Sequence, residues 1–197
     1  ESCGHLQLGT LVDRQVIFSD YIYFSAPNPT LSTHFQKYAD DVKKRIPTWQ
    51  NDLVVEIGSN DGILLKEFDF NGKNILGIDP AENISASVPT LREFFTKETA
   101  RKIATQKGKA KIIMANNVVA HTFDLHDMLL GMKHLLHDDG LIIVEAPWLG
   151  DMFQNNAYDT IYHEHLSYFS VTALTHLFFL FGFIMVDLEF HPVQGNS

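Results

Sequence analysis

The most informative part of this chain is the stretch Leu53-Val54-Val55-Glu56-Ile57-Gly58-Ser59-Asn60-Asp61-Gly62. Its apolar start is typical of a buried parallel strand. A carboxylate follows, then a loop with two glycines, then the apolar, helix-forming segment 63–68. Strand, glycine loop and helix in this order predict a site where a nucleotide-like cofactor lies against bare backbone at a helix N-terminus.

The spacing within the loop separates two classes of cofactor. A dinucleotide-binding loop reads G-x-G-x-x-G, whereas this loop reads G-x-x-x-G, with Glu56 two residues before Gly58. That carboxylate would repel a pyrophosphate and would suit a cofactor that carries an ammonium group, of which S-adenosylmethionine is the obvious candidate. A tight turn that needs glycine for packing alone is the alternative.

A second carboxylate, Asp79, ends the next predicted strand about 20 residues after the first glycine, where it could bind both ribose hydroxyls of a cofactor. Because both nicotinamide cofactors and S-adenosylmethionine contain ribose, Asp79 does not separate them. A simple helix cap is the alternative for this residue.

The length, composition and net charge of the chain limit the classes of protein to which it can belong. The chain has 197 residues, of which 45% are hydrophobic and 20% charged, as expected of one soluble globular domain with at most a small appendage. No apolar run reaches the roughly 20 residues of a membrane span. A formal charge of −9 without a Lys/Arg cluster argues against nucleic acid as a partner. The single cysteine and the lack of a signal peptide favour a cytoplasmic protein, which we expect to be a monomer or a weak homo-oligomer.

Periodicity predicts alternating strands and helices. Strands are expected at 53–57, 74–79, 91–95, 111–115, 141–146 and 183–190, and helices at 31–46, 97–106, 124–136 and 171–181. Pro47 should stop the first helix, Asp138-Asp139-Gly140 should close the third, and Ser170 should cap the last. This alternation predicts an α/β fold with a doubly wound, mostly parallel sheet.

Two further segments have the residue types of a reaction site. Asn116, Asn117 and His121 follow the fourth long strand and could line a pocket, unless the Asn side chains only satisfy a turn. The segment 159–169 holds two His, one Glu and two Tyr. Its imidazoles could take a proton from a carbon acid, a Tyr hydroxyl could donate to an oxyanion, and the carboxylate could orient a ring. A structural turn and a metal site remain alternatives, although His163 and His165 have the wrong spacing for one helical face.

Separated motifs together resemble one family, the sugar C-methyltransferases that act on nucleotide-linked 4-keto deoxysugars and place a methyl group on C3. The motifs are Tyr23-Phe24-Ser25, Asn28-Pro29-Thr30, Glu56-Ile57-Gly58-Ser59-Asn60-Asp61-Gly62, Gly77-Ile78-Asp79-Pro80-Ala81, Ala115-Asn116-Asn117 and Tyr162-His163-Glu164-His165-Leu166-Ser167-Tyr168-Phe169-Ser170. The resemblance runs from about residue 3 to 197 and implies a class I, Rossmann-like methyltransferase fold.

This resemblance also implies a domain plan. Residues 1–30 would be the remnant of a zinc module with a lead-in segment, 31–190 the S-adenosylmethionine-binding domain, and 191–197 the start of a C-terminal domain. Cys3 resembles the last of four cysteine ligands of the zinc module. Because the other three ligands are absent from this chain, we expect it to bind no zinc or other metal.

The family mechanism assigns roles to residues of this chain. His165 resembles the base that removes the C3 proton, and Glu164 would orient or tune it. Tyr162, His121 and Tyr23 resemble groups around the keto oxygen and the sugar. The residues expected to bind S-adenosylmethionine, and S-adenosylhomocysteine as product, are Glu56, Gly58, Ser59, Asn60, Gly62, Asp79, Pro80, Asn116 and Asn117. Alternatives are an O- or N-methyltransferase of a small molecule, a non-catalytic S-adenosylmethionine-binding fragment and a nicotinamide dehydrogenase.

Overall fold

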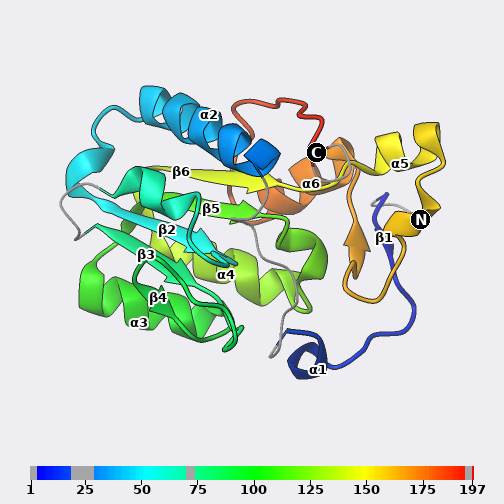
Figure 1. Ribbon diagram of the computed structural model, residues 1–197, viewed down its shortest axis with the longest axis horizontal. Helices are drawn as coiled ribbons and strands as arrows, with labels where there is room; N and C mark the ends of the chain where they lie inside the picture. Colours follow the sequence, from blue (N-terminus) through cyan, green and yellow to red (C-terminus); the bar gives the residue numbers. More distant parts are fainter. Residues whose placement is uncertain (1–3, 19–28, 70–73, 194–196) are drawn as a thin grey trace.

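The centre of the molecule is a parallel sheet in the strand order β4-β3-β2-β5-β6 (Figure 1). The computed structural model describes residues 4–18, 29–69, 74–193 and 197. The strands are β2 (Leu53–Ile57), β3 (Ile75–Ile78), β4 (Thr90–Leu91), β5 (Ala110–Asn116) and β6 (Leu136–Glu145). The chain enters at β2, moves outward to β4, and then crosses back to β5. The strand order therefore reverses between β2 and β5, which is where doubly wound sheets bind their ligands.

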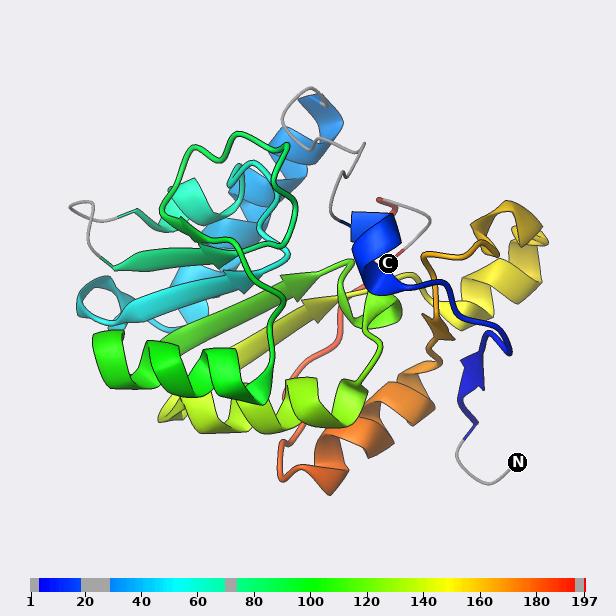
Figure 2. The ribbon, with the colours of Figure 1, turned by 90° about the horizontal axis from the view of Figure 1, so that it is seen from below.

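Helices cover both faces of the sheet, as predicted (Figure 2). On one face lie α2 (Pro29–Arg45) and the short turns η1 (Trp49–Asn51) and η2 (Leu65–Phe68). On the other lie α3 (Lys97–Lys107), α4 (Leu125–Leu135) and α6 (Val171–Leu180). Successive residues of β2 serve opposite faces, since Val54 packs with the first group and Val55 with the second.

A second, antiparallel pair lies beside the main sheet and joins the two ends of the chain. It consists of β1 (Leu6–Gln7) and β7 (Ser167–Tyr168). The Leu8 amide extends the pairing by donating to the Leu166 carbonyl at 2.9 Å. The connecting elements are α1 (Arg14–Phe18), η3 (Val119–His121), α5 (Leu149–Asn155) and η4 (Tyr158–Thr160).

Two of the helix predictions are wrong. The segment 63–68 forms only the short 3-10 turn η2, because Ile63, Leu64 and Leu65 are consecutive and all buried, which one face of a regular helix does not allow. The third helix ends at Leu135, and residues 138–140 belong to β6. Ser170 does cap α6, accepting from the Ala173 amide at 3.1 Å.

The predicted strand 183–190 is also absent from the described structure, although its apolar residues alternate. Ile184 and Val186 are 80% and 76% exposed rather than packed on the sheet. Asp187 and Glu189 instead pair with Arg45 at the end of α2. Those ion pairs direct the segment along the helix, away from the backbone of β6. Among the described helices, none is long and apolar enough to cross a membrane.

Candidate active site

A cavity of about 710 Å³ lies at the carboxyl ends of the central strands. It holds most of the side chains predicted from the sequence. The predicted residues that line it are Glu56, Gly58, Ser59, Asn60, Asp79, Pro80, Asn116, Asn117, His121, Tyr162 and His165. Gly62 and Glu164 are not among its lining residues, and Tyr23 and Cys3 lie outside the described residues. The glycine loop and the histidine segment, more than 90 residues apart in the sequence, therefore face one space.

Both glycines of the loop are required by the backbone and by close contacts. Gly58 and Gly62 have φ of +68° and +82°, a region that side chains disfavour. A Cβ on Gly58 would lie 2.3 Å from a methyl of Val118, and one on Gly62 would lie 2.4 Å from a methyl of Val88. The loop is thus held tightly between the ends of β3 and β5.

The loop offers no spare backbone donors to a ligand. Gly58 and Ser59 donate to the Ile78 carbonyl at 2.7 and 3.4 Å, and Gly62 donates to the Ser59 carbonyl at 2.8 Å. The remaining amides donate to side-chain oxygens. The Asn60 amide donates to Asp79, the Asp61 amide to Asn60 and the Ile63 amide to Asp61. In the part of the chain that the structure describes, no long helix follows the loop either, so the predicted helix N-terminus is absent here, and a pyrophosphate would find no free amide donors in the loop.

Glu56 ends β2 with its carboxylate buried in the wall of the cavity. Its side chain is 4% exposed, and Oε2 has no hydrogen-bond partner among the described residues. Burial raises the pKa of this carboxyl well above its usual 4.5, and the charges of Asp61 and Asp79 raise it further. The Asn116 amide and the Leu65 N–H act in the opposite direction. A buried acid with an unused oxygen is suited to a cationic partner.

Asp79, which directly follows β3, connects that strand to the glycine loop after β2. One of its carboxylate oxygens accepts from the Asn60 amide at 2.8 Å and the other from the Ala81 amide at 2.9 Å. Asn60 has φ of 50°, so this contact also holds the loop in its left-handed turn. Each oxygen has a second lone pair, so Asp79 retains acceptor capacity toward the cavity that it lines.

The ring nitrogens of His165 are distinguished by their partners. Nδ1 lies 2.8 Å from the Thr160 carbonyl, which can only accept, so Nδ1 holds the proton. Nε2 is therefore a lone pair, and the Tyr162 hydroxyl donates to it at 3.1 Å. Burial lowers the pKa of His165, while the Thr160 carbonyl and the charge of Glu164 raise it. A neutral imidazole with an accessible Nε2 is the form that can remove a proton.

Comparison with known proteins identifies the family. A family model described as a methyltransferase domain matches residues 31–188.

The chain belongs to the methyltransferase domain family.

A curated relative of this methyltransferase is the C-methyltransferase NovU of Streptomyces niveus, with 37% identity over 200 residues. The alignment covers 99% of this chain and 48% of NovU, so the chain spans about half the length of that relative.

Solved structures of low sequence identity share the fold. A SAM-dependent methyltransferase from Archaeoglobus fulgidus has a TM-score of 0.58 at 15% identity, covering 81% of this chain and 71% of its own. Magnesium protoporphyrin IX methyltransferase from Synechocystis PCC 6803, solved with bound SAH, has a TM-score of 0.53 at 17% identity, with 92% and 87% covered. The predicted class I methyltransferase fold is confirmed.

The remaining predicted polar residues of the methyltransferase surround His165. The His121 ring lies 4.8 Å from the His165 ring, centroid to centroid, and burial followed by the nearby His165 lowers its pKa to about 4. Burial and the charges of Glu164 and Tyr168 raise the pKa of Tyr162, which therefore keeps its proton. The hydrogen bond that orients His165 comes from Thr160, a residue that the sequence did not indicate, whereas the charge of Glu164 tunes the pKa.

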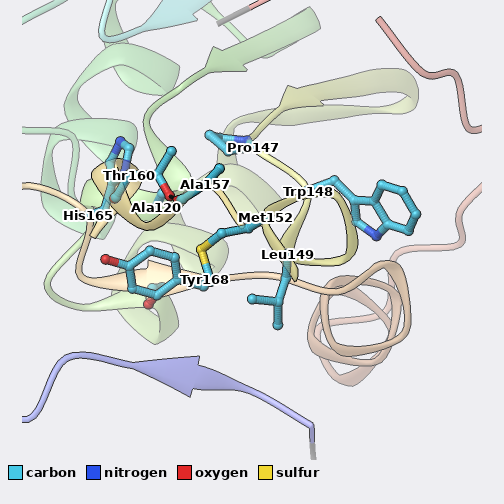
Figure 3. A pocket seen from close by; sticks show the side chains of 10 residues that line it. Ala120, Pro147, Trp148, Leu149, Met152, Ala157, Thr160, His165 and Tyr168 are labelled. Atoms are coloured by element: carbon cyan, nitrogen blue, oxygen red, sulfur yellow. Dashed lines mark hydrogen bonds between the residues drawn. The ribbon is translucent and has the colours of Figure 1, made fainter. Parts of the chain in front are cut away.

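A smaller cavity of about 20 Å³ lies on the other side of His165 (Figure 3). The two cavities share Pro147, Thr160 and His165, so this imidazole lies in the wall between them. The small cavity has the volume of about one water molecule. It is also lined by Tyr168, whose hydroxyl is buried without a partner among the described residues.

The Asn116–Asn117 turn is held from behind by residues that sequence reasoning missed. His34 of α2 lies 2.6 Å from the carboxylate of Glu145, and both side chains are buried. The Glu145 carboxylate also accepts from the Asn117 side chain at 3.3 Å, and the Glu145 backbone carbonyl accepts from the Asn117 backbone amide at 2.7 Å. Tyr38, one helical turn after His34, donates to Asn116 Oδ1 at 3.0 Å. His34 and Tyr38 lie four residues apart on one helix, but nothing local in the sequence pairs them with the end of β5.

Proposed function

We propose that this chain is the catalytic core of an S-adenosylmethionine-dependent C-methyltransferase that methylates C3 of a nucleotide-linked 4-keto deoxysugar through an enolate. One observation carries the proposal: a neutral His165, whose unprotonated Nε2 accepts from the Tyr162 hydroxyl, lines the same cavity as the buried acid Glu56. An oxygen or nitrogen acceptor already has a lone pair, whereas a carbon acceptor requires a base. The 37% identity to a C-methyltransferase supports this choice.

The residues at the loop end of the cavity fit S-adenosylmethionine. Buried atoms without partners among the described residues include Glu56 Oε2, Ser59 Oγ and Asn116 Nδ2, and all three residues line the cavity. They offer an acceptor for the cofactor's ammonium group and polar contacts for its carboxylate. Asp79 and the adjacent Pro80 line the position expected for the ribose. When bound, S-adenosylmethionine supplies a methyl group on a positively charged sulfur.

The histidine end of the cavity would perform the proton chemistry. Nε2 of His165 takes the C3 proton, which is acidified by the neighbouring keto group, while the Nδ1–H remains on the Thr160 carbonyl. The Tyr162 hydroxyl, which points at Nε2 in the free site, turns its proton to the keto oxygen as negative charge develops there. The electron pair left on C3 then bonds to the methyl carbon while the bond between that carbon and sulfur breaks, which leaves neutral S-adenosylhomocysteine. Neutral His121 adds a polar contact without competing positive charge.

The base is tested by the substitution His165→Asn, with His163→Asn as the matched control, because His163 is exposed two residues away and does not line the cavity. We expect H165N to bind S-adenosylhomocysteine like the wild type but to lose both methyl transfer and exchange of solvent deuterium into C3 of a 4-keto sugar nucleotide. A loss on the order of 10²–10⁴-fold is typical of a removed base. H163N should keep both activities.

Two outcomes would point to the rival functions. Methyl transfer that survives in H165N would favour an O- or N-methyltransferase. Calorimetric binding of S-adenosylhomocysteine, together with no deuterium exchange in the wild type, would favour a non-catalytic fragment. The cofactor is tested separately with Glu56→Gln against the exposed control Glu82→Gln: E56Q alone should weaken binding of S-adenosylhomocysteine. Binding of a nicotinamide dinucleotide in its place would overturn the proposal.

A further inference from the structure

The charges that line the main cavity are unevenly placed. Among its described lining residues, the carboxylates are Glu56, Asp79, Asp124, Asp127 and Asp159, and the only guanidinium or ammonium group is that of Arg14. A cavity with this lining repels anions except near the one cation. A substrate with a negatively charged portion therefore has one favourable position for it.

Arg14 stacks on an aromatic ring and has no ion-pair partner among the described residues. It lies on α1, beyond the carboxyl ends of the strands (Figure 2). Its guanidinium lies 4.5 Å from the centroid of the Phe94 ring. Among the described residues, no carboxylate comes within ion-pair distance of this group, and the side chain is exposed. A guanidinium stacked on a ring keeps the N–H groups at its edge available for the oxygens of a phosphate.

A continuous wall of rings connects Arg14 to the catalytic histidines. Phe18 follows Arg14 by one helical turn, a rise of about 6 Å. Its ring lies edge-on to Phe94 at 6.5 Å and edge-on to His121 at 5.8 Å. The His121 ring is 4.8 Å from that of His165. Arg14 and Phe18, whose ring packs against His121, thus lie one turn apart on the same short helix.

We propose that Arg14, supported by Phe94, binds the diphosphate of the nucleotide-linked substrate, while the sugar lies along Phe18 with its C3 at His165. This inference rests on the proposed function and adds a phosphate subsite to it. A planar guanidinium can bind two phosphate oxygens at once, which a point charge does less well. The lead-in segment would then be part of the substrate site and not only a connection to another module.

The test uses calorimetric titration of the chain with adenosine, uridine and thymidine 5′-diphosphates, with the parent nucleosides, and with S-adenosylhomocysteine. The variants are Arg14→Gln and Arg14→Lys, and the matched control is Arg101→Gln, which removes an exposed arginine from α3 away from the cavity. We expect R14Q to weaken diphosphate binding about ten- to a hundredfold, R14K to fall between R14Q and the wild type, and R101Q to match the wild type. S-adenosylhomocysteine should bind all four proteins equally.

Three results would overturn the subsite. Unchanged diphosphate affinity in R14Q would remove Arg14 from the site and leave the proposed function intact. A parallel loss of diphosphate and S-adenosylhomocysteine in R14Q would show that Arg14 serves the cofactor or the fold. If the wild type binds S-adenosylhomocysteine but none of the diphosphates, the proposal of a nucleotide-linked substrate is wrong, and so is the proposed phosphate subsite.

Discussion

His165 shows how one backbone contact can set the chemistry of a side chain. The Thr160 carbonyl fixes the proton on Nδ1, so the lone pair faces the cavity. Burial lowers the pKa of the ring below the ordinary 6.5, and the neutral, competent form therefore predominates above that pKa. We expect deuterium exchange at C3 to be constant through neutral pH and to fall only below pH 6.5 as the ring gains a proton. The pH profile of exchange measures this directly. A midpoint above that value would contradict it, and H163N should share the wild-type profile.

The pKa of Glu56 is raised, whereas that of His165 is lowered, and we therefore expect a different pH-dependent behaviour of Glu56. Burial disfavours its charge, so in the free protein the carboxyl holds its proton to a higher pH than a free glutamate does. A bound ammonium group would lower that pKa again and expel the proton. Near neutral pH, calorimetric enthalpies of S-adenosylhomocysteine binding should therefore differ between two buffers of different ionisation enthalpy. The difference should disappear in E56Q and persist in E82Q. Equal wild-type enthalpies in both buffers would count against proton release.

At the scale of an element, the close contacts of the glycine loop allow a prediction about stability. Gly58 and Gly108 both have positive φ, but a Cβ at Gly108 would meet nothing within 4 Å, whereas one at Gly58 would collide with Val118. Gly108 has φ of 89° and ψ of −177°, a region that is essentially restricted to glycine. Gly108→Ala should therefore cost about 1–3 kcal/mol of unfolding free energy from the backbone alone. Gly58→Ala should cost roughly 1–3 kcal/mol more from overpacking and weaken S-adenosylhomocysteine binding. Urea denaturation of both variants checks the difference, and equal stabilities would exclude the steric contribution.

Helix α2 is joined to the sheet by the His34–Glu145 pair, which is buried, and it also carries the exposed Lys44–Asp41 pair. Breaking a buried pair leaves an uncompensated group and costs about 3–5 kcal/mol, while an exposed pair contributes at most about 1 kcal/mol. His34→Ala should therefore destabilise the protein far more than the control Lys44→Ala in denaturant titrations. Similar losses in the two variants would mean that Glu145 is solvated when His34 is removed.

The elements that the sequence predicts well are those with their own periodicity or caps. The apolar run of β2 predicts its structure because every residue of that strand is buried, and the stripe of α2 does so because its apolar residues are the buried ones. The pair β1–β7 was missed because each strand has only two residues and is defined by its distant partner. The alternation at 183–190 predicted a strand, but alternation alone does not show whether a sheet edge is available, and ion pairs to Arg45 set the path instead.

At the scale of the whole molecule, the N-terminal segment meets the segment that contains His165. The Leu8 amide binds the Leu166 carbonyl, next to His165. Leu8→Pro removes that donor, whose contribution of about 1 kcal/mol corresponds to roughly fivefold. We expect deuterium exchange to fall by this factor while binding of S-adenosylhomocysteine is unchanged. The control Leu8→Val keeps the amide and should keep the rate. A weaker cofactor affinity in L8P would indicate a general loss of structure instead.

The residues of the cavity were predictable where motifs end strands and where the segment 159–169 gathers reactive side chains. Parallel strands bring their carboxyl ends together, so the loop after β2, Asp79 and the Asn116–Asn117 turn were expected at one edge. Arg14, Phe18 and Phe94 carry no local signal, because a short helix and a loop acquire their role from tertiary packing. Thr160 contributes a backbone carbonyl, which any residue could supply, and residue identity therefore gives no indication of its role.

The internally paired amides of the glycine loop have a consequence for selectivity in a mixture of metabolites. Adenosine-containing molecules with phosphate chains share the adenine and ribose of S-adenosylmethionine. They would compete for the cofactor site of any protein whose loop amides bind phosphate. Here the six amides from Gly58 to Ile63 are already bonded within the chain, so the phosphates of such competitors gain no hydrogen bond from the amides of this loop and lie close to Glu56. The loop is selective because it has no free amide donors for phosphate. An excess of nucleotides in the same solution should therefore not displace the cofactor from this site.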